Sequence, residues 1–145
     1  MKKVLFSFLA VLFLFASCEG PPGRDGRDGR DTVRMIFDYE IRNSNWPLTW
    51  QWTGDAYVSV ISIPQLTRQI YENGVVMVFH EWFDGSIWRQ QPLPQSIPQG
   101  NGVDLWTEHL DFDYFIGGIR IFYTNSDFFY EMSPGIRFFR VVFLM

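Results

Sequence analysis

Cysteine, histidine and lysine are scarce in this sequence. One cysteine, Cys18, stands among 145 residues, so no disulfide bond can form within the chain. Two histidines leave few nitrogen ligands for a metal site. The full chain has 12 basic and 16 acidic residues and a formal charge of −4. Lysine occurs only at Lys2 and Lys3, within the predicted signal peptide, so the chain without them has ten arginines against 16 acidic residues, a formal charge of −6. This balance argues against nucleic acid or an anionic membrane surface as a partner.

Sequence motifs of common catalytic sites are also missing. The chain has no Gly-x-Ser-x-Gly nucleophile motif, no phosphate-binding loop and no candidate catalytic cysteine. We therefore expect neither an enzyme nor a bound cofactor.

The first 17 residues are typical of a signal peptide. Lys2 and Lys3 precede an apolar run from Val4 to Ala16 that is interrupted only by Ser7. At about 13 residues, this run is shorter than the roughly 20 that a membrane-spanning helix needs. An ordinary cleaved signal and a retained N-terminal membrane helix are the alternatives to the lipoprotein signal described next.

Cys18 directly follows the small residues Ala16 and Ser17. This stretch resembles a bacterial lipobox, in which the leader is cut before the cysteine and the cysteine is lipidated, although Phe15 stands where leucine is usual. The resemblance implies a lipid anchor at Cys18, and Glu19 in place of aspartate implies the outer membrane. Two or more acyl chains hold a protein on a membrane stably.

Residues 18–31 form a predicted linker with glycine at every third position. A Gly-Pro-Pro triplet is followed by three Gly-Arg-Asp triplets. Only glycine fits the axis of a collagen helix, so a trimerising stub is one interpretation. Because the repeat is short and only its first triplet carries proline, we favour a disordered spacer.

Residues 32–145 predict a single domain made almost entirely of strands. Alternating apolar and polar residues and β-branched runs mark the strands. The predicted ranges are 33–41, 48–52, 57–63, 75–83, 87–93, 103–115, 119–124 and 136–145. About eight short strands favour an all-β fold, a single antiparallel β-sandwich, with a jelly roll as a variant.

Local signals refine this prediction. Pro64 to Glu72 predicts a short helix, with Asn73-Gly74 as a left-handed cap or, alternatively, as a hairpin turn. Asp84-Gly85 predicts a hairpin between its two neighbouring strands. Residues 75–79 are apolar on both faces, which predicts a central strand. Prolines 92, 94 and 98 predict an edge or a loop, and we expect loops at 95–102 and 125–135.

The chain resembles a family of small Bacteroidetes-type lipoproteins of unknown function. The resemblance rests on Cys18, the Gly20-to-Asp31 triplets, the segment from Ile63-Pro64 to Asn73-Gly74-Val75-Val76, and the closing Phe139-Arg140-Val141-Val142. It implies a cell-envelope location and a β-sandwich, and it supplies neither a substrate nor catalytic residues.

Histidines and carboxylates offer few chemical candidates. His109, Asp111 and Asp113 share one face of a regular strand, where they could contribute to a metal site, but a solvated polar face is the favoured interpretation. His80 and its neighbour Glu81 point to opposite faces. A glycosidase pair could be drawn from four carboxylates, which is a weak signal in an acidic protein: Glu81, Asp84, Glu108 and Asp111.

Six tryptophans are the strongest remaining functional signal. Trp82 and Trp88 flank the predicted hairpin, and Trp106 follows the predicted 95–102 loop. Our first hypothesis is a glycan- or peptide-binding module that stacks its ligand on exposed aromatic rings; the candidate residues are Trp46, Trp50, Trp52 and Trp88. The alternative function is a structural subunit of an envelope complex, joined through a sheet edge or an aromatic patch. Tryptophans that simply fill the core remain the alternative for each position.

Overall fold

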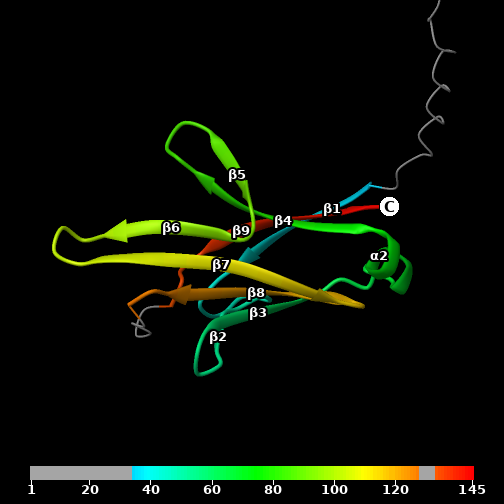
Figure 1. Cartoon of the computed structure of the whole chain (residues 1–145), viewed down its shortest axis with the longest axis horizontal. Helices are drawn as coiled ribbons and strands as arrows, with labels where there is room; N and C mark the ends of the chain where they lie inside the picture. Colours follow the sequence, from blue (N-terminus) through cyan, green and yellow to red (C-terminus); the bar gives the residue numbers. More distant parts are fainter. Residues whose placement is uncertain (1–33, 128–132) are drawn as a thin grey trace, which may run out of the picture. The chain divides into compact units, whose positions relative to one another are not determined.

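The computed structural model describes residues 34–127 and 133–145, which fold as a sandwich of two antiparallel sheets with nine strands and one short helix (Figure 1). This confirms the predicted all-β sandwich. The signal peptide, Cys18, the Gly-x-y linker and part of the predicted 125–135 loop lie outside the described residues. Within the described ranges, no helix has both the length and the apolar character that a membrane crossing requires.

The first sheet has the strand order β1-β9-β4-β5, and all neighbours are antiparallel. Its strands are β1 (Arg34–Ile41), β9 (Arg137–Leu144), β4 (Val75–Phe83) and β5 (Trp88–Pro92). β9 lies between β1 and β4. β4 pairs with β9 from Val75 to Glu81 and with β5 from Phe79 onward. Within the stretch 75–79 only Val76 and Val78 are buried and Val75 is 53% exposed, so the stretch buries one face instead of both.

The second sheet has the order β2-β3-β8-β7-β6. Its strands are β2 (Gln51–Trp52), β3 (Tyr57–Ser62), β8 (Gly118–Asn125), β7 (Leu105–Phe115) and β6 (Gln95–Gly100). β6, β7 and β8 are sequential strands that lie side by side in this sheet. That arrangement is a meander rather than the interleaved strand order of a jelly roll.

The predicted loop at 95–102 is largely an edge strand. β6 pairs with β7 from Gln95 opposite Leu110 to Gly100 opposite Leu105. Pro98 is compatible with this strand because β6 has a neighbour on one side only, so its missing N–H can face away from the ladder. The loop prediction was wrong because the hydrogen-bonding partner is β7, which no local pattern in 95–102 reveals.

The helix α2 (Arg68–Asn73) links β3 to β4 and therefore joins the two sheets at one end of the sandwich. Thr67 caps its N-terminus by accepting a hydrogen bond from the backbone N–H of Ile70 at 3.4 Å. The predicted left-handed cap is wrong, because Gly74 has φ −99° and runs directly into β4. Position 74 has no room for a side chain, because a Cβ there would lie 2.8 Å from the carbonyl oxygens of both Ile70 and Leu144.

The core between the sheets is apolar near α2. The side chains of Ile63, Leu66 and Ile119 are at most 1% exposed, and Ile70 of α2 belongs to the same buried cluster. Backbone hydrogen bonds from Ile63 N to Gly117 O and from Gly117 N to Leu66 O, both 2.8 Å, fasten this end. The other end of the core is polar and contains His80, Gln95, Glu108 and Arg137.

Candidate functional site

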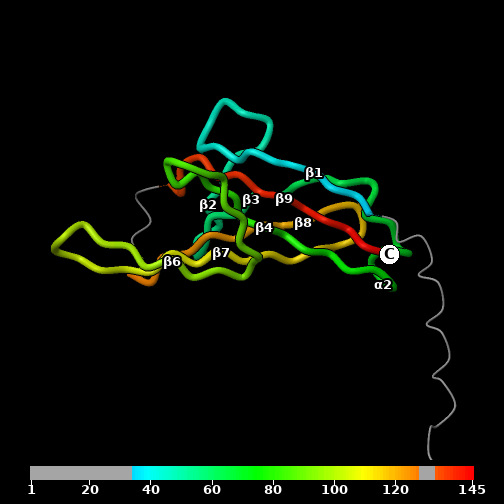
Figure 2. Tube along the Cα trace, turned by 90° about the horizontal axis from the view of Figure 1, so that it is seen from above, coloured from blue at the N-terminus to red at the C-terminus, as the bar shows by residue number. Residues whose placement is uncertain are grey.

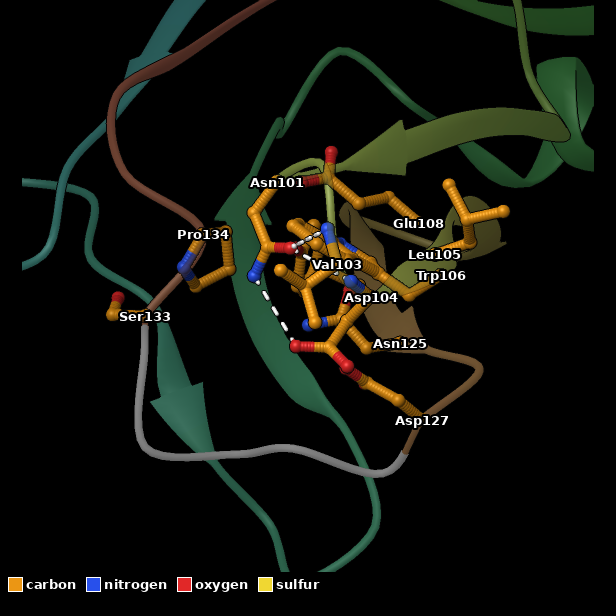
Figure 3. A pocket seen from close by; sticks show the side chains of 11 residues that line it. Asn101, Val103, Asp104, Leu105, Trp106, Glu108, Asn125, Asp127, Ser133 and Pro134 are labelled. Atoms are coloured by element: carbon orange, nitrogen blue, oxygen red, sulfur yellow. Dashed lines mark hydrogen bonds between the residues drawn. The ribbon is translucent and has the colours of Figure 1, made fainter.

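A pocket of about 830 Å³ lies at the polar end of the sandwich (Figure 3). Two segments that are distant in sequence border it: the tip of the β6–β7 hairpin and the residues that follow β8 and precede β9. Its lining residues are Asn101, Val103, Asp104, Leu105, Trp106, Glu108, Tyr123, Asn125, Asp127, Ser133 and Pro134. Ligand pockets in proteins commonly measure about 300–1,000 Å³.

The rim of the pocket is a tight turn at the hairpin tip. Asn101 Oδ1 accepts hydrogen bonds from the backbone N–H groups of Val103 (2.9 Å) and Asp104 (2.7 Å). Asn101 Nδ2 also donates to Asp104 Oδ2 at 3.3 Å (Figure 3). Gly102 has φ +90°, which its lack of a side chain allows. These bonds hold the Asp104 carboxylate at the rim.

The alternation of β7 turns Trp106 and Glu108 toward the same inner face. Glu108 is 8% exposed, and its Oε2 accepts a hydrogen bond from Arg137 Nη2 at 2.9 Å. The Arg137 guanidinium also lies 6.0 Å from the centre of the Tyr123 ring. Three strands, β7, β8 and β9, therefore fix the polar floor of the pocket.

Tyr123 is 4% exposed and remains protonated at physiological pH. Burial, followed by the negative charge of Glu108 and a hydrogen bond with it, raises the pKa of Tyr123 to about 12. Its hydroxyl therefore keeps its proton over the whole physiological range and forms a hydrogen bond with Glu108.

Trp50, a predicted ligand-stacking residue, lies in the core with 6% exposure. Its indole N–H donates to the carbonyl oxygen of Gly135 at 3.1 Å. Its ring packs 6.2 Å from the rings of Tyr123 and Phe139. Trp50 therefore supports Tyr123 from behind and offers no face to a ligand, which corrects its predicted role.

The other three predicted tryptophans are exposed but do not come together. Trp46 is 40% exposed, lies in the turn after β1 and carries the Arg42 guanidinium 3.9 Å from its ring centre. Trp52 lies on β2 of the second sheet, next to Tyr57. Trp88 lies on β5 of the first sheet. Among the described lining residues, the pocket contains a different tryptophan, Trp106.

His80 lies in the polar part of the core with 3% exposure. Its Nδ1–H donates to Gln95 Oε1 at 3.0 Å, and Gln95 Nε2 donates to Gln91 Oε1 at 2.9 Å. Burial lowers the pKa of His80 to about 4; the hydrogen bond with Gln95 opposes this shift and the Arg137 charge adds to it. His80 is therefore neutral at physiological pH.

The four candidate carboxylates of a glycosidase pair are separated. Glu81 and Asp84 belong to the β4–β5 hairpin of the first sheet, whereas Glu108 and Asp111 point to opposite faces of β7. Outward-facing Asp113 forms an ion pair with Arg120, and His109 Nδ1 lies 3.0 Å from Ser96 Oγ. Within residues 34–127 and 133–145, no three His, Asp or Glu side chains gather as a metal site would need.

The pocket is acidic. Asp104, Glu108 and Asp127 line it, and its described lining contains neither lysine nor arginine. Asn101 and Asn125 add amide groups that can donate hydrogen bonds, whereas the Tyr123 hydroxyl already forms a hydrogen bond with Glu108. Comparisons with protein-family models, with curated proteins and with solved structures give no match for this chain.

Proposed function

We propose that this protein is a non-catalytic binding module that takes a neutral, hydroxyl-rich glycan into the pocket at the polar end of its sandwich. The observation that carries the proposal is the combination of an indole ring, that of Trp106, with carboxylate and amide side chains around a cavity of about 830 Å³. A few oriented polar groups beside aromatic surface are the general composition of small-ligand sites.

The chemistry of the lining favours neutral sugars over acidic ones. An indole ring offers an apolar face for the C–H groups of a sugar ring, and the carboxylate of Asp104 accepts hydrogen bonds from neighbouring hydroxyls. A uronic acid or a sulfated sugar would place its negative charge beside Asp104 and Asp127, and the one nearby guanidinium, Arg137, is already paired with Glu108.

The interactions of Glu108 with its neighbours favour binding without catalysis. Its carboxylate is already occupied by the Arg137 guanidinium and by Tyr123. A hydrolase would need a second carboxylate across the scissile bond. Of the four carboxylates that the sequence offered for such a pair, only Glu108 lines the pocket. The two other acidic side chains in the lining, Asp104 and Asp127, lie in turns, and Asp104 already accepts a hydrogen bond from Asn101.

We also propose that the domain is held at the outer membrane by lipid on Cys18, with residues 18–31 as the spacer. About 13 extended residues at roughly 3 Å each give a reach of some 40 Å from the lipid. Mass spectrometry of the mature protein tests this directly. An N-terminal acylated Cys18 is expected, whereas an intact leader or a bare thiol would contradict the anchor.

Calorimetric titration of the full chain with cello-, manno- and xylo-oligosaccharides tests the glycan proposal, with polygalacturonate fragments as the acidic comparison. We expect saturable binding to at least one neutral series and none to the acidic one. Trp106→Ala should weaken binding at least about tenfold, a loss of about 1.4 kcal/mol or more. The control Trp88→Ala removes a tryptophan that is 59% exposed and outside the pocket, and should leave the affinity unchanged. Equal losses in both variants would contradict the assignment of the pocket.

A further inference from the structure

The four strands at the sheet edges differ in how well they are protected from pairing with another strand. β2 has two residues, β5 has five and ends at Pro92, and β6 contains Pro98. β1 has eight residues and no proline. Natural proteins blunt sheet edges with short strands and proline because an open edge is a template for another strand. Among the described strands, β1 is therefore the edge best suited to extend its sheet.

The backbone groups on the open side of β1 can be identified from the turn that follows it. Arg42 N–H donates to Leu48 O and Arg42 O accepts from Trp50 N–H, both at 3.1 Å, so the Arg42 backbone faces away from β9. Because the backbone N–H and C=O groups of successive residues point to opposite edges of a strand, those of residues 40, 38, 36 and 34 also face away from β9. Glu40 O accepts from the Trp46 indole at 3.1 Å, which leaves the edge from Arg34 to Asp38 without a paired strand among the residues that the structure describes. Figure 2 shows β1 at the margin of its sheet, with the turn folded back beside its far end.

This open stretch is complementary to a second copy of itself. If two β1 strands run antiparallel about a two-fold axis at Ile36, Ile36 faces Ile36, and Arg34 of each copy faces Asp38 of the other. All three side chains point to the outer face, where Arg34 is exposed, Ile36 is 40% exposed and the Asp38 side chain is 59% exposed. Opposite charges and apolar residues directly across two strands stabilise their pairing.

We propose that two copies of this chain pair edge to edge through residues Arg34 to Asp38 of β1, so that their four-stranded sheets form one continuous sheet. The two-fold arrangement is closed, because each copy has one such edge. Asp38 already accepts two hydrogen bonds from Arg140, and a carboxylate has further lone pairs for the incoming Arg34. The pairing stops before Glu40, where Trp46 covers the carbonyl. Because Arg34, Ile36 and Asp38 complement the same three residues of another copy, the partner is a second copy rather than a peptide of another protein.

Disulfide trapping of the full chain tests the proposal. Directly opposed residues of a hydrogen-bonded antiparallel pair have Cα atoms about 5.5 Å apart, within the roughly 4.4–6.8 Å that a disulfide spans. Ile36→Cys should therefore give a covalent dimer on mild oxidation in membranes, seen on a non-reducing gel. Val60→Cys, 55% exposed on β3 of the other sheet, and the parent chain with Cys18 alone are the controls and should give none.

Charge reversal then tests the register. In the Ile36→Cys background, Arg34→Asp places like charges opposite each other twice and should reduce the trapped dimer about tenfold or more. Adding Asp38→Arg should restore the dimer, because each introduced aspartate then faces an introduced arginine of the other copy. Arg140 loses its partner at position 38 but keeps Glu81, which lies 3.5 Å away. No dimer above the Val60→Cys level, or trapping of a different protein at Ile36→Cys, would overturn the proposal. A dimer that Arg34→Asp does not weaken would overturn the register.

Discussion

The two ends of the sandwich are built from the same strands but hold the sheets together in different ways. At the α2 end, the space between the sheets is filled by aliphatic side chains and sealed by backbone hydrogen bonds to Gly117. At the pocket end, the equivalent positions carry His80, Gln95, Glu108 and Arg137, and a cavity remains. Buried polar groups stabilise a fold less than apolar packing of the same volume.

The difference indicates which end carries stability and which carries binding. Apolar burial contributes about 25 cal/mol per Å², and it is concentrated near α2. The polar network contributes little net stability, because the desolvation of its groups offsets their hydrogen bonds. It does fix the orientation of Tyr123 and Glu108 beneath the pocket. Substitutions at the α2 end should therefore affect unfolding alone, whereas those at the pocket end should also affect binding.

The largest expected effect is at the apolar end. Phe143 is fully buried and its ring lies 5.6 Å from that of Phe37. Phe143→Ala should lower the free energy of unfolding by about 3–5 kcal/mol, through lost transfer energy and the cavity left behind. Urea denaturation measures this, with Phe83→Ala, at a side chain that is 53% exposed, as the control that should cost less than about 1 kcal/mol. If the two variants lose similar stability, the apolar end does not carry the fold.

The next effect depends on pH. The folded-state pKa of His80 is about 4, below the 6.5 of an unperturbed histidine, so the unfolded chain binds this proton more readily. The stability that depends on neutral His80 is fully present above pH 6.5. It is lost as the pH falls to 4, and the loss then amounts to about 3 kcal/mol. Carboxylates titrate in the same range, so the measurement is the difference between the parent chain and His80→Gln in urea denaturation at several pH values.

His80→Gln should flatten the fall in stability between pH 6.5 and 4 relative to the parent chain. His109→Gln is the matched control, because His109 lies on the exposed face of β7, and its profile should follow the parent. A parallel profile for His80→Gln would show that His80 is not held neutral by burial.

The third effect is smaller, and it compares the loss of a buried ion pair with the loss of an exposed one. Glu108→Gln leaves the Arg137 charge in a site where its side chain is only 23% exposed, and should cost about 2 kcal/mol and weaken glycan binding. Glu72→Gln removes the partner of Arg68 on the surface of α2, and should cost less than about 0.5 kcal/mol with binding unchanged. Equal costs for the two substitutions would contradict the difference between the ends.

The smallest effect concerns the helix cap at the apolar end. Thr67→Ala removes the acceptor for the Ile70 N–H and should lower the free energy of unfolding by about 1 kcal/mol. Thr67→Ser keeps a capping oxygen and should restore most of this loss. Loss of stability in both variants would assign the effect to the threonine methyl group rather than to the cap.

Local patterns predicted most strands because each carries its own signal, alternation at 33–41 and 103–115 and a β-branched run at 57–63. They failed where the structure depends on a distant partner. β6 is a strand because β7 lies beside it, and Gly74 is required because the carbonyl of Leu144 approaches it. Neither fact leaves a signature within the segment itself.

The pocket was predictable only in part. Trp106 and Glu108 are two residues apart on a predicted strand, and this spacing alone places them on one face. Tyr123 and Arg137 come from two other strands, and only the register of β7, β8 and β9 brings them to Glu108. Trp50 was misjudged for a related reason, since its proximity in sequence to a turn did not reveal that the chain near Gly135 covers it.

The most direct measurement of the central claim is a titration followed by the indole N–H signals of the six tryptophans, with ¹⁵N-labelled protein and each signal assigned by single Trp→Phe variants. With a neutral oligosaccharide that binds in calorimetry, the Trp106 signal should shift most and that of Trp50, one layer beneath Tyr123, less. The signals of Trp46, Trp52 and Trp88 should not move. A saturable shift at any of those three with Trp106 unchanged would contradict the assignment of binding to the polar end.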